Sequence, residues 1–307
     1  MKRKSLIFIM MLFSISGILI MSCEKNIPVE EGEKLSDLDI ELAKDDAIAD
    51  DIYDDIDGVV QEKLMELSEN NYQTLTTKST EDEYICLIVT VDYPDSTRFP
   101  KVITFDYGDG CTVIFNGDTI FKKGKIIVTL TDKFDVPGSQ HIMTFDEFYI
   151  NEVKVEGTRT ITYQGLNDSG LLLFEISLEN GKLTFQDPVT GELLTYTREA
   201  LLTKEWLRTH IPVEDTVYMN GSLWGVNVYG ENYSREIIET LTLVHCPEYG
   251  RRWVIVDGQI LSKIGEIETI IDYEDGGCDG TALVRREEAR HTIRIREQHR
   301  IRTGGRK

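Results

Sequence analysis

Two short glycine-containing loops carry clusters of aspartate. The aspartates are Asp106 and Asp109 in the first loop and Asp272, Asp275 and Asp279 in the second. Carboxylate oxygens are the ligands that Ca²⁺ prefers, but the spacing differs from an EF-hand loop, which runs for about twelve positions and ends in glutamate. Asp-Gly is also a common way to turn a strand. A calcium site and plain turn chemistry therefore both stay open, and turn chemistry is favoured. No other cofactor is expected.

The remaining chemistry-bearing residues show no recognisable catalytic spacing. The five histidines lack a His-x-x-His or His-Glu-x-x-His arrangement, and neither a Gly-x-Ser-x-Gly elbow nor a glycine-rich phosphate loop is present. A carboxylate pair for glycoside hydrolysis cannot be chosen among 54 acidic residues without geometry. Trp206, Trp224 and Trp253 could line a sugar or peptide groove, although core packing is the favoured role for them.

The cysteines divide into one near the amino terminus and four in the body of the chain. An even number is compatible with two disulfides in an exported protein, and four cysteines allow three pairings. Each sequential pair flanks a predicted hairpin, and a disulfide needs Cα atoms within about 7 Å of each other. We therefore favour Cys86 with Cys111 and Cys246 with Cys278.

The amino terminus has the pattern of an export signal. Lys2, Arg3 and Lys4 precede an apolar stretch over residues 6–21. This stretch ends in Ile20-Met-Ser-Cys23, which resembles a bacterial lipobox, in which the cysteine is acylated and becomes the first residue. Acyl chains such as palmitate anchor with about 0.8 kcal/mol per buried CH₂. We expect a signal peptide over 1–22 and a lipid anchor on Cys23.

The net charge of the chain bears on which partners it can bind. The 307 residues include 54 acidic and 33 basic side chains, which gives a formal net charge of −21. This charge argues against nucleic-acid binding. Eight arginines after residue 284 nevertheless form a basic carboxyl-terminal segment, for which a strand or a tail is expected.

An acidic amphipathic helix is predicted within residues 38–67. Apolar residues recur there every three or four positions, and six aspartates between 45 and 55 fill the positions between them. The apolar stripe is expected to pack against a sheet. Gly58 costs about 1 kcal/mol relative to alanine, so two shorter helices are an alternative.

From residue 84 onward, short runs of β-branched and aromatic residues end in Gly, Asn, Asp or Pro. Short turns between runs predict an antiparallel meander that forms a sandwich or a curled, partly open barrel. The turns include 151–152, 167–170, 179–181, 188–191, 230–232 and 263–265, and one helix is expected at 198–208. Strands are predicted at 84–92, 101–107, 125–132, 140–150, 153–163, 171–178, 182–186, 192–198, 216–229, 233–244, 252–260, 266–273 and 291–296.

Several of these segments resemble those of a known protein family. The body of the chain, from about 84 to 279, resembles an uncharacterised lipoprotein family of the Bacteroidetes. The resemblance implies export, lipidation and β architecture, and it carries no activity. The segments are Cys86-Leu-Ile-Val-Thr-Val, Phe99-Pro-Lys-Val-Ile-Thr-Phe-Asp-Tyr-Gly-Asp-Gly-Cys-Thr112, Lys123-Gly-Lys-Ile-Ile-Val-Thr129, Val153-Lys-Val-Glu-Gly-Thr-Arg-Thr160 and Asp272-Tyr-Glu-Asp-Gly-Gly-Cys-Asp279.

These observations together predict an exported protein of mainly β structure, lipid-anchored to a bacterial membrane in the cell envelope. The outer membrane is the expected location, on either its periplasmic or its surface side. The expected organisation is a signal peptide (1–22), an anchored acidic stalk with the helix (23–80), an antiparallel β domain (81–284) and a basic strand or tail (285–307). Non-catalytic binding or scaffolding is the leading function, with an envelope protein or a glycan as partner. The alternative is a carbohydrate-active hydrolase that uses Asp and Glu.

Overall fold

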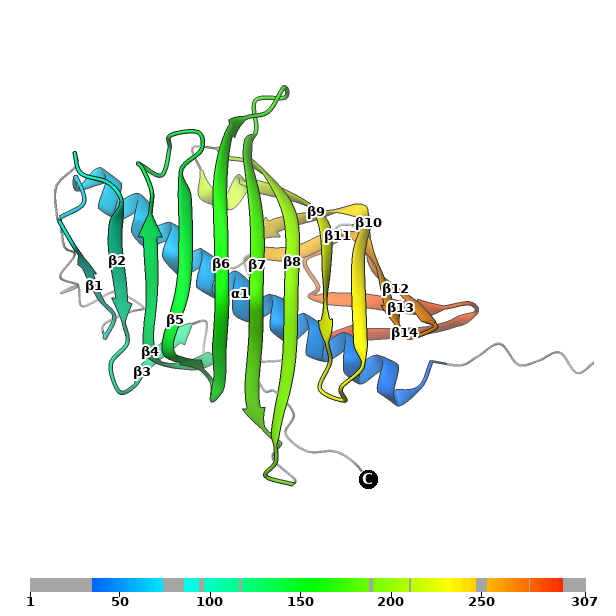
Figure 1. Cartoon of the computed structure of the whole chain (residues 1–307). Coiled ribbons are helices and arrows are strands. Elements are labelled where there is room, and N and C mark those ends of the chain that lie inside the picture. Colours follow the sequence, from blue (N-terminus) through cyan, green and yellow to red (C-terminus); the bar gives the residue numbers. More distant parts are fainter. Residues whose placement is uncertain are drawn as a thin grey trace, which may run out of the picture. The chain divides into compact units, whose positions relative to one another are not determined.

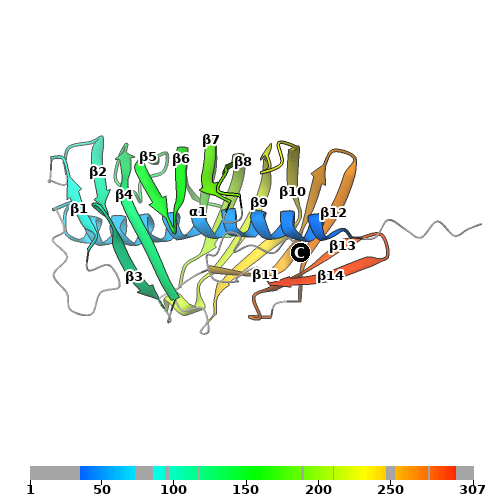
Figure 2. The same ribbon diagram turned by 90° about the horizontal axis from the view of Figure 1, so that it is seen from below.

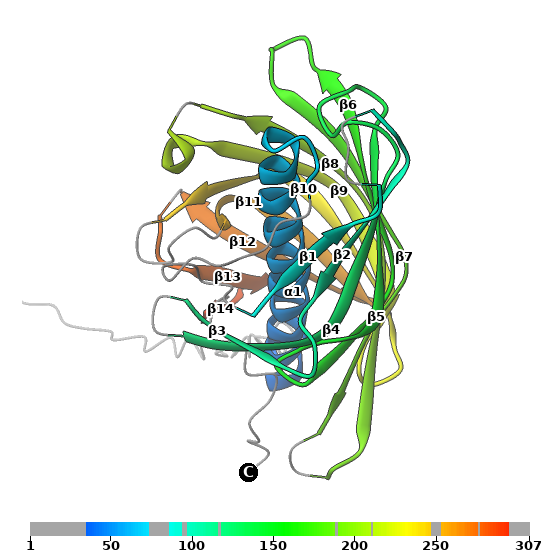
Figure 3. The same cartoon turned by 90° about the vertical axis from the view of Figure 1, so that its left-hand side faces the viewer.

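One long helix lies against the concave side of one curled antiparallel sheet (Figures 1 and 3). This is seen in a computed structural model that describes residues 35–73, 86–93, 97–115, 118–187, 190–209, 211–246, 253–275 and 277–294. Residues 33–307 form one compact unit. The predicted signal peptide and Cys23 lie outside the described residues. Among those residues, the helix is too polar to cross a bilayer.

The sheet has fourteen strands within the described residues, and sequence neighbours pair throughout except at β3. Its order is β1-β2-β4 and then onward to β14, while β3 pairs only with β4. The predicted antiparallel meander is therefore confirmed as a curled open sheet. The strands are β1 (Ile88–Val91), β2 (Lys101–Asp106), β3 (Cys111–Phe115), β4 (Asp118–Leu130), β5 (Gln140–Ile150), β6 (Val153–Leu166), β7 (Leu172–Gln186), β8 (Leu193–Leu207), β9 (Thr216–Val226), β10 (Asn232–His245), β11 (Trp253–Ile264), β12 (Ile267–Asp275), β13 (Thr281–Arg286) and β14 (Ala289–Arg294).

Turn residues end most strands where the sequence predicts. Asn151 and Glu152 both have positive φ and join β5 to β6. Asn167–Gly170 joins β6 to β7, and Gly230 lies in the turn between β9 and β10. A short 3₁₀ helix, η1 (Pro212–Glu214), precedes β9. Side-chain oxygens of asparagine stabilise such turns by accepting backbone N–H groups, as Asn167 does from Ser169 and Leu171.

Two sequence predictions in this region are wrong. The predicted turn at 179–181 is a β-bulge inside β7, where the pairing with β8 shifts between Leu178 and Gly181. The predicted helix at 198–208 is part of β8, in which buried side chains alternate with more exposed ones. Its residues have good helix propensity, but hydrogen bonding to β7 and β9 on both sides overrides that preference.

Bulges bend the long strands around the helix. Register shifts interrupt most of the long pairings, including β4 with β5, β6 with β7 and β11 with β12. Gly124 lies at the first of these shifts with φ +81°, where a Cβ atom would lie 2.0 Å from the carbonyl oxygen of Glu147. A bulge increases local twist and bends its strand. The repeated bulges therefore explain why the sheet curls.

The helix α1 (Asp37–Glu69) is continuous through Gly58, so the two-helix alternative is wrong. It begins with a capping box, in which Ser36 and Asp39 each accept the other's backbone N–H. Residues along its length, among them Ile52, Ile56, Leu64 and Leu67, are buried in the main core with side chains of β1 to β10. The predicted packing of the apolar stripe against the sheet is therefore confirmed (Figure 2).

Substitution of Gly58 by alanine is expected to stabilise the protein by about 0.5–1 kcal/mol, because alanine has the higher helix propensity. Gly58 is exposed, and a Cβ atom there would meet nothing within 4 Å. Urea unfolding followed by far-UV circular dichroism measures the effect. An unchanged or lower free energy of unfolding for Gly58→Ala would contradict this expectation.

Two disulfides join the cysteines of the body in the predicted pairs. Cys86 bonds to Cys111, and Cys246 bonds to Cys278. The first closes 25 residues and fastens the segment before β1 to β3. The second closes 32 residues and links the end of β10 to the turn before β13. Loops of this length correspond to roughly 3–4 kcal/mol of stabilisation in the chain-entropy model.

Candidate functional site

Buried cations from alternate strands neutralise the acidic face of α1. At the centre, Arg198 of β8 and Arg235 of β10 share Asp46 and Asp50 of the helix. Arg235 Nη1 lies 3.2 Å from Asp50 Oδ2, and Arg235 Nε lies 3.5 Å from Asp46 Oδ2. Arg198 Nη1 donates to Asp50, and the hydroxyl of Tyr196 donates to Asp46. Burial alone would raise the pKa of Asp50, but the two guanidinium groups lower it below its ordinary value.

Three further ion pairs extend this row along the helix. Arg159 of β6 binds Asp57 through two nitrogens, at 2.6 and 2.8 Å. Lys122 of β4 pairs with Asp55, and Arg286 of β13 lies 2.6 Å from Asp39. Seven helical residues rise by about 10.5 Å, close to twice the roughly 4.8 Å spacing of strands. This match holds for Asp50 and Asp57, which are seven residues apart and pair with Arg198 of β8 and Arg159 of β6. The other ion pairs do not follow it, since Asp55 lies only two residues from Asp57 and pairs with β4.

These ion pairs engage the carboxylates of the concave face in holding the helix. The helix has thirteen acidic and two basic residues, so it carries −11 of the −21 charges of the chain. Its apolar residues fill the core, and its inward carboxylates are satisfied by cations of the sheet. The acids that the fold brings together are thus engaged in holding the helix in place, and the concave face is occupied by the protein's own chain.

His141 on the inner face of β5 makes the fold sensitive to acid. Burial lowers the pKa of His141 to about 4, against a weak opposing effect of Asp57. The unfolded chain takes up this proton near pH 6.5, so stability is complete above that pH and falls between pH 6.5 and 4. We expect a loss of roughly 3 kcal/mol by pH 4 from this residue. The lowered pKa of Asp50 adds a further loss at still lower pH.

Urea unfolding between pH 7 and 4 tests this prediction with His141→Gln, which cannot take up the proton. The variant should lose less stability over this range than the wild-type chain. Matched stability losses in the two proteins would show that His141 does not cause the pH dependence.

An aromatic cluster lies on the inner face near the end of β8. The rings of Trp206 and Trp253 meet edge to face with centroids 6.4 Å apart, and the His245 ring lies tilted against Trp253 with centroids 4.0 Å apart. Trp206 is buried, and its indole N–H donates to Asp215 at 3.1 Å. Lys204 Nζ lies 5.6 Å from one indole ring and 5.8 Å from the other. Burial lowers the pKa of Lys204 despite the nearby Asp57 and Asp54. The structure thus places Trp206 in the core.

The third tryptophan, Trp224, lies on the opposite, outer face of the sheet. It is 40% exposed on β9, and its cross-strand neighbours are Glu199 of β8 and Ser234 of β10. Two residues further along the same face, Leu201 is 58% exposed opposite Ser222. Exposed tryptophan and leucine side chains beside hydroxyl groups and a carboxylate form a small amphipathic surface. We call it the Trp224 patch.

The Trp224 patch ends a row of uncharged side chains that crosses the outer face. The strand registers align one residue from each of seven strands between β2 and β9, and none of these residues is charged. On a chain with 28% charged residues, such a row is a distinct surface. Its members are Val102, Thr129, Ile142, Thr160, Ser177, Leu201 and Ser222.

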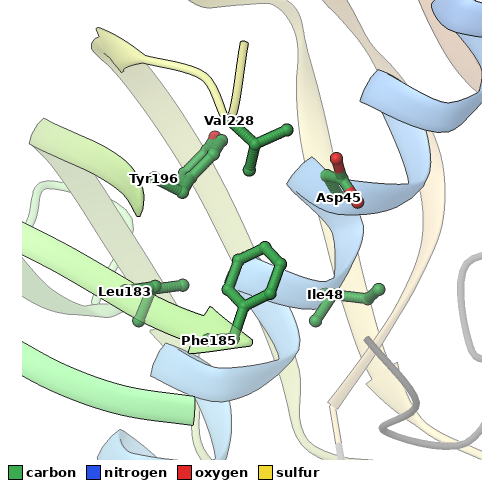
Figure 4. Close-up of a pocket in the computed structure, with 6 residues that line it drawn as sticks. All are labelled: Asp45, Ile48, Leu183, Phe185, Tyr196 and Val228. Atoms are coloured by element: carbon green, nitrogen blue, oxygen red, sulfur yellow. The ribbon is translucent and has the colours of Figure 1, made fainter. Parts of the chain in front are cut away.

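A small pocket opens beside α1, between the helix and the ends of β7 and β8 (Figure 4). It is lined by Asp45, Ile48, Leu183, Phe185, Tyr196 and Val228, and its cavity volume is about 10 Å³. A volume of about 10–15 Å³ on this measure holds a single water molecule. Asp45 is the one carboxylate that lines it. The pocket is therefore too small for a substrate.

The two aspartate loops lie far apart in the strand order, the first after β2 and the second after β12. Asp106 accepts the N–H of Gly108 and lies 3.3 Å from Lys125. Asp272 accepts the N–H of Glu274 and lies 2.7 Å from Arg285. Within the described residues no group of three or more His, Cys, Asp or Glu side chains could hold a metal ion. The resolved contacts are those of turns and ion pairs, and the side chain of Asp275 lies outside the described residues.

Sequence reasoning missed the buried basic residues that position the helix. Arg159, Arg198 and Arg235 each occupy an inward position of a strand, where the period-2 pattern calls for an apolar side chain. A basic residue at the inward position of alternate strands, together with a helix rich in aspartate, is the signal that could have predicted them. Comparison with protein-family models, curated proteins and solved structures finds no match for this chain.

Proposed function

We propose that this chain is an exported, lipid-anchored envelope protein that binds a neutral glycan without catalysis, through the Trp224 patch. The observation that carries the proposal is the exposure of Trp224 and Leu201 on the outer face, at the end of the row of uncharged side chains. A rigid indole ring offers a large stacking surface at small entropic cost. Ser222, Ser234 and Glu199 beside it supply hydroxyl and carboxylate groups that can hydrogen-bond to sugar hydroxyls.

Two further features support export and anchoring. The two disulfides suit an oxidising compartment outside the cytoplasm. The sequence before the described residues has a charged segment, an apolar segment and Ser22-Cys23 in the order of a lipoprotein signal. Mass spectrometry of the amino-terminal peptide from membrane-extracted protein tests the anchor. An acylated Cys23 at the terminus supports it, and an unmodified Cys23 within an intact signal sequence contradicts it.

Affinity electrophoresis through gels that contain neutral polysaccharides tests the binding function. The wild-type protein should be retarded by at least one polysaccharide of a panel of glucans, mannans and xylans. Trp224→Ala should weaken that retardation about fivefold or more, since stacking of a nucleic-acid base on one aromatic side chain is worth about 1–3 kcal/mol and we expect a similar contribution for a sugar ring.

The control is Leu193→Ala, which removes a 73% exposed leucine from the other end of the outer face of β8. Equal retardation of wild type and Trp224→Ala, or equal weakening by both substitutions, would count against the Trp224 patch. A reducing-sugar assay on the same polysaccharides would detect turnover, which the proposal does not expect.

A further inference from the structure

The last hairpin of the sheet, β13–β14, presents arginines on its outer face. The registers place Arg285, Arg290 and Arg294 on that face, with Arg285 directly opposite Arg290. Arg285 pairs with Asp272 at 2.7 Å, whereas Arg290 and Arg294 are exposed and form no ion pair with a described residue. The chain continues beyond β14 with five basic residues and one acidic residue. From residue 281 to the end, the sequence thus has nine basic and three acidic residues, in contrast to the acidic remainder of the chain.

Arg290 and Arg294 carry the uncompensated charge of this face, because Asp272 neutralises Arg285. A charged edge strand resists aggregation, but charges of either sign would serve that purpose. Two arginines on the edge strand of a chain with a net charge of −21 therefore favour a negatively charged partner.

The arginines lie at the end of the unit from which the chain leads back to Cys23. Arg286 of the same hairpin lies 2.6 Å from Asp39 in the first turn of α1, and Leu35 and Ile40 pack in the cluster that contains Val284 and Ile293. Leu35 lies twelve positions after Cys23 in the sequence, so twelve Cα–Cα steps join them. Fully extended, they span about 40 Å at most. A lipid on Cys23 would thus tether the molecule from the end that carries this hairpin.

We infer that the outer face of β13–β14 contacts the anionic lipid headgroups of the membrane that carries the protein. This inference rests on the lipid anchor of the proposed function. Basic residues close to a membrane surface are attracted to anionic lipids over roughly a Debye length. The contact orients the unit with β13–β14 toward the bilayer. The acidic remainder, which the same surface repels, and the Trp224 patch then project into the solvent.

A spin label on the outer face of β14 tests the contact. Thr292 lies between the two unpaired arginines and is exposed, so Thr292→Cys gives the labelling site. The full-length protein is reconstituted in vesicles of phosphatidylcholine alone or with 30% phosphatidylglycerol, and the collision rate with a nickel chelate is measured. We expect at least a twofold lower collision rate on the anionic vesicles, reversed by 0.5 M NaCl. A label at exposed Thr144 on β5 should not respond.

Charge variants complete the design. Arg290→Glu with Arg294→Glu should abolish the protection of residue 292, and lysine at both positions should retain it. The control pair, Lys133→Glu with Lys182→Glu, changes the net charge equally elsewhere and should retain protection. Equal collision rates on both vesicles would overturn the inference. So would protection that appears only with added dextran sulfate, since that would identify a soluble polyanion as the partner. Mass spectrometry of Cys23 reports separately on the anchor.

Discussion

Substitution of Arg235 by methionine is expected to lower the free energy of unfolding by about 3–5 kcal/mol, because it breaks a buried ion-pair network on one side. Arg235 is buried and contacts both Asp46 and Asp50. Without it, two aspartates would share the single guanidinium of Arg198. Methionine keeps most of the volume and removes only the charge and its hydrogen bonds. Equilibrium urea unfolding at pH 7 measures the loss.

The matched control is Lys263→Met, which removes a cation of an exposed pair with Glu268. Exposed pairs contribute about 0–1 kcal/mol. A second variant, Asp50→Asn combined with Arg235→Met, removes one charge of each sign and should recover part of the loss. If Arg235→Met destabilises no more than Lys263→Met, the row of ion pairs does not hold the helix in place.

Substitution of Gly124 by alanine is expected to destabilise the protein by about 3 kcal/mol or more, since it combines backbone strain with a steric clash. Gly124 has φ +81°, and an added Cβ would lie 2.0 Å from the Glu147 carbonyl oxygen and 2.8 Å from that of Asp146. Both atoms belong to the backbone of β5, so relief requires that the two strands separate at the bulge. Thermal and urea unfolding report the change.

The control Gly138→Ala measures the stability cost of the backbone conformation without the cost of a steric clash. Gly138 has a similar φ of +89°, but a Cβ there would meet nothing within 4 Å. This control should lose only about 1 kcal/mol from the unfavourable backbone conformation. Equal losses at the two positions would mean that the close approach of β4 and β5 contributes nothing, and the bulge would then not be a fixed feature of the curl.

Local signals in the sequence predicted the hairpins well, because their turns depend on a few residues. Asn151 and Gly230 adopt positive φ in the turns that they were expected to form. The pairs of cysteines followed from the same hairpins. Gly181 was misread because a glycine flanked by asparagine suits a turn and a bulge equally, and only pairing with β8 distinguishes them.

The features that involve distant segments could not be predicted in the same way. The contact of Asp46 with Arg235 joins residues 189 positions apart, and neither residue signals the other locally. Residues 198–207 form a strand because they pair with β7 and β9 on both sides, although their own propensity favours a helix. Trp224 is exposed because its neighbour Leu223 is buried in the main core with residues of the helix, and successive residues of a strand point to opposite faces.

The seven-residue spacing of Asp50 and Asp57 matches the spacing of β8 and β6, and it fixes the register of the helix against this part of the sheet. One hairpin inserted between these two strands would move Arg198 and Arg159 apart by about 10 Å, and about seven more helical residues would then be needed between the two aspartates. Insertions of other lengths would rotate one aspartate away from its partner. Variation in the size of this part of the architecture should therefore occur in paired steps, with a hairpin and two turns of helix gained or lost together.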